Sequence, residues 1–589
     1  MKTKFIWLIV SCLMVAALVL ASCAPAVVEG EKEAKVVTKE AEKKVAEVEK
    51  VAEKKVGPQY GGIANIGTFW EVSNFDPLDA IWQTTAVMGF THNALIEGDW
   101  YVDRSVTDYF FAWDYRLVTE SWKGNLAETW EMPDDLTIIF NLRKGVRWQN
   151  KPPLNGREFV ADDVVKYYDR LLKAPRFLVH KLQVIDKVTA VDKYTVRFDL
   201  KNPFAQALMV IVWQKITAQE IYDTFGDARH WTTTIGTGPF TLEDFVLGSS
   251  LTFKRNPDYW EKDPRNGNQL PYVDGVKSLM IPDSATRFAA LRTGKIDQDF
   301  EIPWTSKDAL MAAAPELSWA VWPDASAFTI FPKNSIEPTS NVKVRQALSM
   351  AIDRKAIAEA LFPPGVGKYQ DFPARSSWAG IYIPFEELSD VGKMVRTYDP
   401  VAAKALLAEA GYPNGFKTSI QYIAFGAWEF AEDMLAMVKE TWAEIGVDFE
   451  LRPVDAGTMS SLRYAPFPYE HMLGVAGGTA EPIDLINGKF ISGAPWNRAV
   501  VADPVIDALY DKIKVELDAS KRMPLLKELF NYILEEAKCF TPVLGSTYGA
   551  WWPWFKDYAG EQTINYHRGG VMAHIWIDQD LREEMTGRR

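Results

Sequence analysis

Two periodicities of apolar residues alternate along this chain, and their alternation most limits the folds that it can adopt. In some segments every second side chain is apolar, which predicts strands with one buried face; these are residues 136–142, 194–200 and 447–451. In others apolar side chains recur three and four residues apart, which predicts helices with one buried stripe; these are residues 344–352, 400–410 and 430–445. No repeat period joins the segments, so a mixed α/β or α+β fold follows.

Single residues mark where two of these helices begin and end. Asp399 followed by Pro400 is typical of a helix N-cap and first turn. Gly411 and Gly446 are typical of helix C-termini, where the chain adopts a left-handed conformation. These signals predict helices that start at residue 400 and that end before residues 411 and 446.

The N-terminus has the pattern of a secretion signal. Lys2 and Lys4 precede an apolar run over residues 5–20, which is short for a membrane span and typical of a signal peptide. Leu20 and the small residues Ala21 and Ser22, followed by Cys23, resemble the lipobox of bacterial lipoproteins. That resemblance implies removal of residues 1–22 and acylation of the Cys23 thiol, whose acyl chains would anchor the protein to the membrane. An ordinary secretion signal with a fortuitous cysteine is the alternative.

Residues 23–57 form a segment of different composition. Residues 29–56 consist almost entirely of Glu, Lys, Ala and Val, without aromatic residues or proline. Such a segment has too little apolar mass to fold alone, which predicts a flexible or partly helical tether. A short coiled coil is the alternative, because Val45, Val48 and Ala52 follow a spacing of three and four residues.

Charge and cysteine content exclude some classes of protein. The 589-residue chain carries a formal net charge of −13 without a concentrated basic stripe, which argues against a nucleic-acid partner. Cys12 lies in the leader and Cys23 in the lipobox-like segment, so Cys539 alone remains and no intrachain disulfide is expected. The 22 Trp, 22 Tyr and 31 Phe residues suit either core packing or the lining of a ligand cleft.

Signatures of catalysis are missing from the sequence. Residues 362–369 superficially resemble a phosphate-binding loop, but Phe362 stands at the first glycine position and Tyr369 at the Ser/Thr position. The six histidines form neither H-E-x-x-H nor a zinc-type spacing with cysteine, and no G-x-S-x-G elbow occurs. We therefore predict no metal, no cofactor and no catalytic residue. A cell-surface hydrolase built from distant carboxylates remains the alternative of another class.

A series of short motifs, in chain order from about residue 60 to residue 561, resembles the extracellular solute-binding protein family 5. The motifs include Leu126-Ala127-Glu128 with Trp130, Gly145-Val146 with Trp148, Gly236-Thr237-Gly238, Leu291-Arg292-Thr293-Gly294 with Asp297, Val344-Arg345-Gln346-Ala347, and Gly560-Glu561. We expect most of these motif residues to be structural. Gly236 and Gly238 are predicted to permit tight turns, and Asp353-Arg354 to form a salt bridge at a helix end.

The resemblance implies a fold and a function. The fold is an α/β two-lobe clamp of the periplasmic-binding-protein kind (class II), with an extra domain in the first lobe. The first lobe would comprise residues 58–100, 232–325 and 541–589, the extra domain residues 101–231, and the second lobe residues 326–540. The function is that of a monomeric, extracytoplasmic solute-binding subunit of an ABC importer, which delivers an oligopeptide to a permease driven by ATPase subunits.

The ligand class is the point at which the chain departs from the family. In peptide-binding members an acidic side chain pairs with the peptide α-ammonium, and alignment on Glu481-Pro482 places Gly478 at that position. Because a buried ammonium without a counter-charge is costly, a neutral oligosaccharide is kept as the alternative ligand. The residues predicted to bind ligand are Gly477, Gly478, Thr479, Trp428, Trp496 and Arg463. Core packing of both tryptophans and solvent exposure of Arg463 are the alternatives.

Overall fold

The computed structural model describes residues 57–69, 72, 74–78, 82–103, 121–174, 182–212, 214–363, 369, 373–375, 378, 380–423, 430–476, 482–564 and 568–589. The chain divides into two compact units, Met1–Pro58 and Gln59–Arg589, and every helix and strand among the described residues belongs to the second.

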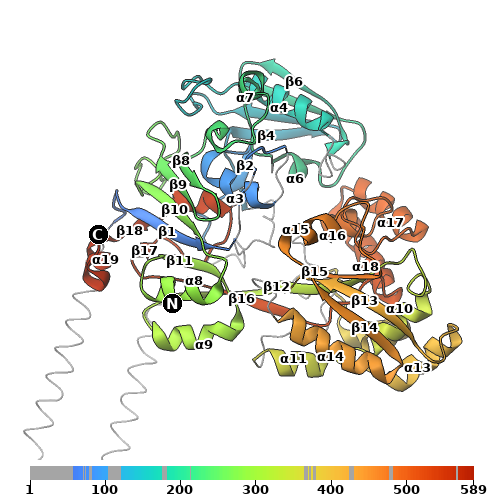
Figure 1. The fold of residues 1–589 in the computed structure, drawn as a ribbon. Coiled ribbons are helices and arrows are strands. Elements are labelled where there is room, and N and C mark those ends of the chain that lie inside the picture. Colours follow the sequence, from blue (N-terminus) through green and yellow to red (C-terminus); the bar gives the residue numbers. More distant parts are fainter. Residues whose placement is uncertain are drawn as a thin grey trace, which may run out of the picture. The chain divides into compact units, whose positions relative to one another are not determined.

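Among the described residues, a ten-stranded mixed sheet is the framework of this second unit (Figure 1), with the order β14-β13-β15-β12-β16-β11-β1-β10-β9-β8. Its strands are β1 (Ile63–Thr68), β8 (Phe240–Val246), β9 (Ser250–Arg255), β10 (Gly275–Met280), β11 (Gln298–Ile302), β12 (Ser318–Pro332), β13 (Phe416–Tyr422), β14 (Val447–Pro453), β15 (Met472–Ala476) and β16 (Leu544–Trp551). β12 pairs antiparallel first with β16, between Ser318 and Ala327, and then with β15, between Phe328 and Pro332. Strands β12 and β16 therefore connect the two halves of the sheet.

The first lobe is the half built on β1 and β8–β11, with its own apolar core. Its helices are α3 (Trp82–Thr91), α8 (Ser284–Arg292), α9 (Trp304–Ala313), η5 (Arg568–Ala573) and α19 (Gln579–Thr586). The second lobe is the half built on β13–β15, with a separate core. Its helices are α10 (Val342–Met350), α11 (Arg354–Leu361), α12 (Asp390–Arg396), α13 (Pro400–Glu409), α14 (Ala431–Glu444), α15 (Ala456–Leu462), α16 (Pro482–Lys489), α17 (Pro504–Val515) and α18 (Ala519–Glu535).

A smaller four-stranded sheet has a third core. Its order is β4-β5-β7-β6, formed by β4 (Ala127–Asp134), β5 (Thr137–Leu142), β6 (Ile185–Asp192) and β7 (Thr195–Leu200), and α4 (Ala161–Lys173) packs on it. Ile138 and Phe140 of β5 and Phe198 of β7 are fully buried, as their period of two predicts. Because this sheet lies in the chain between α3 and β8, it is called the inserted domain.

The predicted periodicities agree with the observed elements, with one difference at a boundary. β5, β7 and β14 coincide with the predicted strands, and α13 begins at Pro400 with the Asp399 carboxylate accepting from the Ala402 N–H. α10 ends at Met350, before the last two residues of its predicted stripe. Ala351 and Ile352 are fully buried in the turn that follows, so burial continues the apolar pattern beyond the helix.

Two predictions about single motif residues are wrong. Asp353 caps α11, its carboxylate accepting from the Ala356 N–H, whereas the buried Arg354 donates to the carbonyl and hydroxyl oxygens of Ser349. The expected salt bridge between neighbours is replaced by these two separate roles. Gly236 and Gly238 do not have positive φ angles; instead, a Cβ at either would lie within 2.1–2.5 Å of the Thr91 backbone. Close packing is thus the reason for glycine there.

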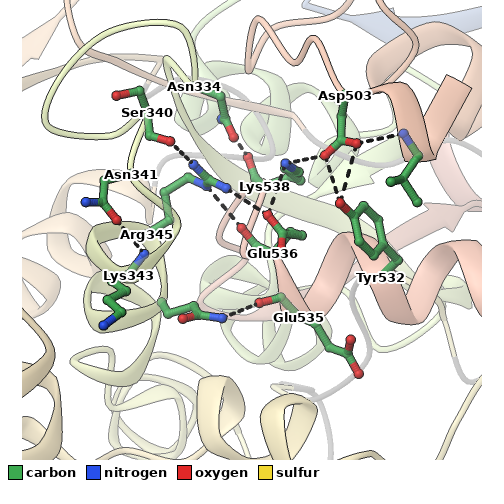
Figure 2. A network of polar contacts seen from close by, with 12 residues as sticks. Asn334, Ser340, Asn341, Lys343, Arg345, Asp503, Tyr532, Glu535, Glu536 and Lys538 are labelled. Atoms are coloured by element: carbon green, nitrogen blue, oxygen red, sulfur yellow. Dashed lines mark hydrogen bonds and ion pairs between the residues drawn. The ribbon is translucent and has the colours of Figure 1, made fainter. Parts of the chain in front are cut away.

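The motif around Arg345 has the structural role that was expected, as Figure 2 shows. The Arg345 guanidinium donates to the carbonyl oxygens of Thr339, Ser340 and Glu536 and reaches the Glu536 carboxylate at 3.3 Å. Lys538 in turn pairs with Asp503 at 2.7 Å. These contacts hold the chain between α18 and β16, the strand that returns to the first lobe.

Candidate functional site

Contacts between the lobes lie on both sides of the connecting strands. Trp304 of α9 packs against Phe362 of the second lobe, with ring centroids 5.3 Å apart. From the inserted domain, the Ala205 N–H donates to the Lys514 carbonyl oxygen at the end of α17, over 2.8 Å. Along β12 the pairing with β16 is irregular between Trp322 and Ser326. Such an irregularity locally weakens the strand ladder and is a natural place for bending.

A cavity opens in the first lobe at the strand β1. It encloses about 570 Å³ of empty space, including solvent at its mouth. Its floor is a row of side chains in register across four strands, Gln298, Ile66, Ser278 and Leu251. Its apolar walls come from α3 and η5, which lie against each other, and are formed by Val87, Phe90, Val571 and Met572.

The topology explains why a cavity forms at β1. β1 pairs in parallel with β10 on one side and β11 on the other. Ile66 and Thr68 face the cavity, whereas a Cβ at Gly67 would lie 3.2 Å from the Arg287 side chain of α8, so α8 covers the opposite face. In open α/β sheets, ligands bind beyond the carboxyl ends of strands where successive connections leave in opposite directions.

Polar groups gather at one end of this cavity. Gln298 is 1% exposed, and its Nε2 donates to the Tyr558 hydroxyl oxygen over 3.0 Å. Its Oε1 has no hydrogen-bond partner among the residues that the structure describes. The buried Glu561 also lines the cavity, and its carboxylate accepts from the Ala559 N–H over 2.7 Å. An apolar cavity with a few polar groups at one end is the usual form of a small-molecule site.

A second cluster, in the second lobe, contains two of the predicted site residues. The Arg463 guanidinium lies 5.1 Å from the centre of the Tyr464 ring, and that ring lies 6.3 Å from the ring of Trp496. The Ala465 N–H donates to the Pro495 carbonyl oxygen over 3.3 Å, which ties the two loops together. Arg463 and Trp496, both half-buried, therefore belong to one cluster although they are distant in sequence.

The second-lobe cluster is cationic. Burial, followed by the positive charge of Arg463, lowers the pKa of Arg498 to about 10. The buried Nε of Arg463 has no hydrogen-bond partner within the described part of the chain. Two guanidinium groups held close together, beside aromatic rings, favour an incoming anion such as a carboxylate.

The other predicted site residues are not tested by the structure. Gly477, Gly478, Thr479 and Trp428 lie outside the described residues, as does Cys23. Conversely, the sequence analysis missed Gln298, although it singled out the neighbouring Asp297. The two side chains lie on opposite faces of the sheet, and Asp297 accepts from the Trp554 indole N–H. The strand period of two was the signal that could have pointed to Gln298, because side chains of neighbouring strand residues lie on opposite faces of the sheet.

The described residues contain neither a candidate membrane span nor a candidate metal cluster. None of the helices there is long and apolar enough to cross a membrane. No group of three or more His, Cys, Asp or Glu side chains in those ranges is placed to hold a metal ion.

Comparison with known proteins agrees with this two-lobed architecture. The periplasmic binding protein DppA from Helicobacter pylori, solved in complex with peptide STSA, superposes with a TM-score of 0.72 at 21% identity, covering 88% of this chain and 99% of that one. The likeness confirms the predicted α/β two-lobe clamp. At this identity the likeness is one of fold.

The family follows from the sequence matches. Residues 121–475 match the family described as bacterial extracellular solute-binding proteins, family 5 Middle. Heme-binding protein A of Haemophilus influenzae is 31% identical over 385 residues, which is 62% of this chain and 67% of that protein. The dipeptide-binding protein of Escherichia coli is 28% identical over 394 residues, 62% and 69% of the two chains. The chain belongs to the bacterial extracellular solute-binding proteins of family 5.

Proposed function

We propose that this protein is the lipid-anchored, extracytoplasmic solute-binding subunit of an ABC importer, and that it captures an oligopeptide between its two lobes. The observation that supports the proposal is a cavity in one lobe and a cationic cluster in the other, with the two lobes joined through β12 and β16. The first lobe holds the cavity at Gln298, and the second lobe holds the cationic cluster at Arg463. A solute that contacts both surfaces stabilises the closed arrangement, which a permease can then recognise.

The division into domains is part of the proposal. The first lobe comprises residues 58–100, 232–325 and 541–589, the inserted domain residues 101–231, and the second lobe residues 326–540. Bending occurs at the irregular pairing between Trp322 and Ser326, where fewer ladder bonds need to be disturbed.

A peptide matches the chemistry of both surfaces. Its carboxylate suits the Arg463 guanidinium, whose Nε has no partner among the described residues. An apolar side chain suits the cavity between α3, η5 and the sheet. A dipeptide-binding protein and a protein solved with a bound peptide are among its relatives. A permease and ATPase subunits on other chains complete the importer.

A neutral oligosaccharide is the second candidate ligand. The observation that favours it is the pair of half-buried rings, Tyr464 and Trp496, whose centroids lie 6.3 Å apart. Aromatic rings of this kind stack on the apolar faces of sugars and supply area at low cost in conformational entropy. The cationic charge of the neighbouring arginines is not needed for a neutral sugar, so this candidate stands second.

The ligand experiment compares peptides with oligosaccharides. Purified protein is titrated with both sets while thermal stability is followed, and the recovered ligand is weighed by mass spectrometry. At one hundred times Kd a peptide should stabilise the fold by about 2.7 kcal/mol and be recovered intact. Stabilisation by oligosaccharides alone would instead support the second candidate, and cleavage of the peptide would show that the protein is an enzyme.

The role of Arg463 has a matched control. Arg463→Gln should weaken peptide binding about tenfold or more, because a charge-assisted hydrogen bond is lost. Arg452→Gln removes a guanidinium that pairs with Glu450 and Glu470 in the same lobe, and should leave binding unchanged. Equal effects of the two substitutions would remove Arg463 from the site.

The lipid anchor is tested separately from ligand binding. Cys23→Ser should move the protein from the membrane fraction to the soluble fraction, because no thiol remains to be acylated. Cys12→Ser, within the leader, should leave the protein in the membrane fraction. Retention of the Cys23→Ser protein on membranes would contradict the anchor.

A further inference from the structure

We infer that the first-lobe cavity is a specificity subsite for an aromatic group that carries a hydrogen-bond donor, such as an indole or a phenol. Gln298 supplies the acceptor. The inference rests on the proposed function in one respect, namely that this aromatic group is a side chain of the captured peptide. The cavity and its acceptor are otherwise independent of what the second lobe binds.

The acceptor is held in place on both sides. Gln298 belongs to β11, where Ile66 of β1 and Trp551 of β16 are its register partners. Its Nε2 donates to the Tyr558 hydroxyl oxygen over 3.0 Å. The Tyr558 ring packs edge-on against Trp551, with centroids 4.9 Å apart. The Nε2 contact with this packed hydroxyl group orients the carboxamide.

The oxygen of this carboxamide is buried and unsatisfied. Gln298 is 1% exposed, lines the cavity, and has an Oε1 without a hydrogen-bond partner among the described residues. A buried acceptor without a donor is destabilising, whereas native proteins nearly always satisfy such groups. A ligand N–H or O–H inside the cavity would satisfy it. A ligand ring of the same shape that lacks a donor would fill the cavity but leave the Gln298 Oε1 without a hydrogen bond.

The remaining walls select for shape. Val87 and Phe90 of α3, Leu251 of β9 and Met572 of η5 present apolar surface. Phe90 is itself fixed by stacking on Phe253, with centroids 4.3 Å apart. Rigid apolar walls beside the polar end at Gln298 and Glu561 accommodate a flat ring whose single donor faces that end.

The test uses three probes of one shape. Indole carries a donor, N-methylindole carries neither donor nor strong acceptor, and benzofuran carries an acceptor in the place of the donor. Binding of each to the full protein is measured by saturation-transfer NMR and titration calorimetry. Indole should bind about tenfold or more tightly than the other two, since only indole pairs with the buried oxygen. Equal affinities, or a preference for benzofuran, would overturn the inference.

Two substitutions locate the binding. Gln298→Leu replaces the carboxamide by an apolar group of similar size and should abolish the preference for indole over N-methylindole. Val87→Phe fills the cavity and should abolish binding of all three probes. The control is Gln421→Leu on β13 of the second lobe, which should change neither result. Thermal unfolding of each variant shows that it is folded, and an indole preference that survives Gln298→Leu would contradict the assignment.

A peptide series separates this inference from the proposed function. Tripeptides that differ only in one Trp, Tyr or Phe residue are titrated while lobe closure is followed by small-angle X-ray scattering. The Trp and Tyr peptides should bind about tenfold more tightly than the Phe peptide, and Gln298→Leu should remove the difference. If all three close the lobes equally, the function stands and the subsite is wrong. If indole binds as expected but no peptide closes the lobes, the subsite stands and the peptide ligand is wrong.

Discussion

Two buried charge clusters, one in each half of the molecule, are built from the same groups but balanced differently. In the first cluster the carboxylates of Glu97 and Glu261 both contact the single ammonium of Lys123, at 3.6 and 2.7 Å. Both carboxylates are less than 9% exposed. Burial raises the pKa of Glu97 to about 7, and the charge of Glu261 adds to the rise, against the opposing charges of Lys123 and Lys215. This cluster joins β2 (Ile96–Gly98) and β3 (Trp122–Gly124) to the first lobe.

The second cluster, shown in Figure 2, pairs its cations and carboxylates evenly. Lys538 contacts Asp503 at 2.7 Å and Glu536 at 3.3 Å, and Arg345 also reaches Glu536. The side chain of Glu536 is 28% exposed. Burial would raise the pKa of Asp503, but the hydrogen bond and charge of Lys538 hold it below its usual value. The comparison teaches that the burial of a carboxylate, weighed against the cations that reach it, decides whether it stays ionised at neutral pH.

The largest expected effect comes from removing the shared cation. Lys123→Met leaves two carboxylates buried without their ion-pair partner, which should cost roughly 3–5 kcal/mol of the free energy of unfolding. Urea denaturation followed by circular dichroism measures it. The double variant Lys123→Met/Glu261→Gln should recover part of the loss, because one stranded charge is gone. A loss of less than about 1 kcal/mol would show that water reaches this cluster freely.

The next effect is the pH dependence of stability, to which His574 and Glu97 contribute with opposite signs. Burial lowers the pKa of His574 to about 4, so the unfolded chain takes up a proton below pH 6.5 that the folded chain does not. Stability from this group is complete above pH 6.5 and is lost as the pH falls toward 4. A tenfold change in proton affinity corresponds to about 1.4 kcal/mol, so the full loss is roughly 3 kcal/mol.

The contribution of Glu97 to stability changes with pH in the opposite direction to that of His574, over nearly the same pH range. Its raised pKa keeps it protonated in the folded chain up to about pH 7, whereas the unfolded group ionises above 4.5. Its contribution therefore falls as the pH rises through that window. Glu97→Gln should make stability rise more steeply between pH 4.5 and 6.5, and His574→Gln should make it rise less steeply. Denaturant melts across the window measure both slopes, and identical slopes would contradict the assignment.

A smaller effect is expected in the second cluster. Lys538→Met leaves Asp503 its hydrogen bonds from the Tyr532 hydroxyl and the Val505 N–H, while Glu536 keeps Arg345 and some water. The loss should be about 1–3 kcal/mol, below that of Lys123→Met in the same urea assay. A larger loss than in the first cluster would reverse the comparison.

The smallest loss of stability is expected for an exposed ion pair, which serves as the reference for the two clusters. Lys343 pairs with Glu409 at 3.0 Å on the surface, where the two side chains are 48% and 62% exposed. Lys343→Ala should change the free energy of unfolding by no more than about 0.5 kcal/mol, because solvent screens the pair. A change above about 1 kcal/mol would mean that α10 depends on this contact as well.

Much of the local structure was predictable from short-range patterns. The period of two in β5 and β7, and the capping signals around α13 and α14, each depend on residues close in sequence. The exact end of α10 was not predictable, because Ala351 and Ile352 are buried by the second lobe and not by the helix itself. Arg354 was misjudged for the same reason, since its partner Ser349 is brought near by the turn between two helices.

The candidate site was predictable only in part. Arg463 and Trp496 were singled out separately, and the structure places them in one cluster through Tyr464. Gln298 gave no signal of its own, because its importance comes from Ile66, Ser278 and Leu251 on three other strands. The Gly477–Thr479 stretch and Trp428 stay predictions.

What the sequence alone determined is the class of the chain, through alternating strands and helices and through motifs that resemble one family. These depend on neighbours in the chain, so local propensity and spacing are sufficient to reveal them. The tertiary structure decided the cavity, the orientation of the Gln298 oxygen and the balance of the buried charges. The cavity and the Gln298 orientation depend on strand register and burial between residues more than 200 positions apart, and Lys123 and Glu261 of the buried charges are 138 positions apart.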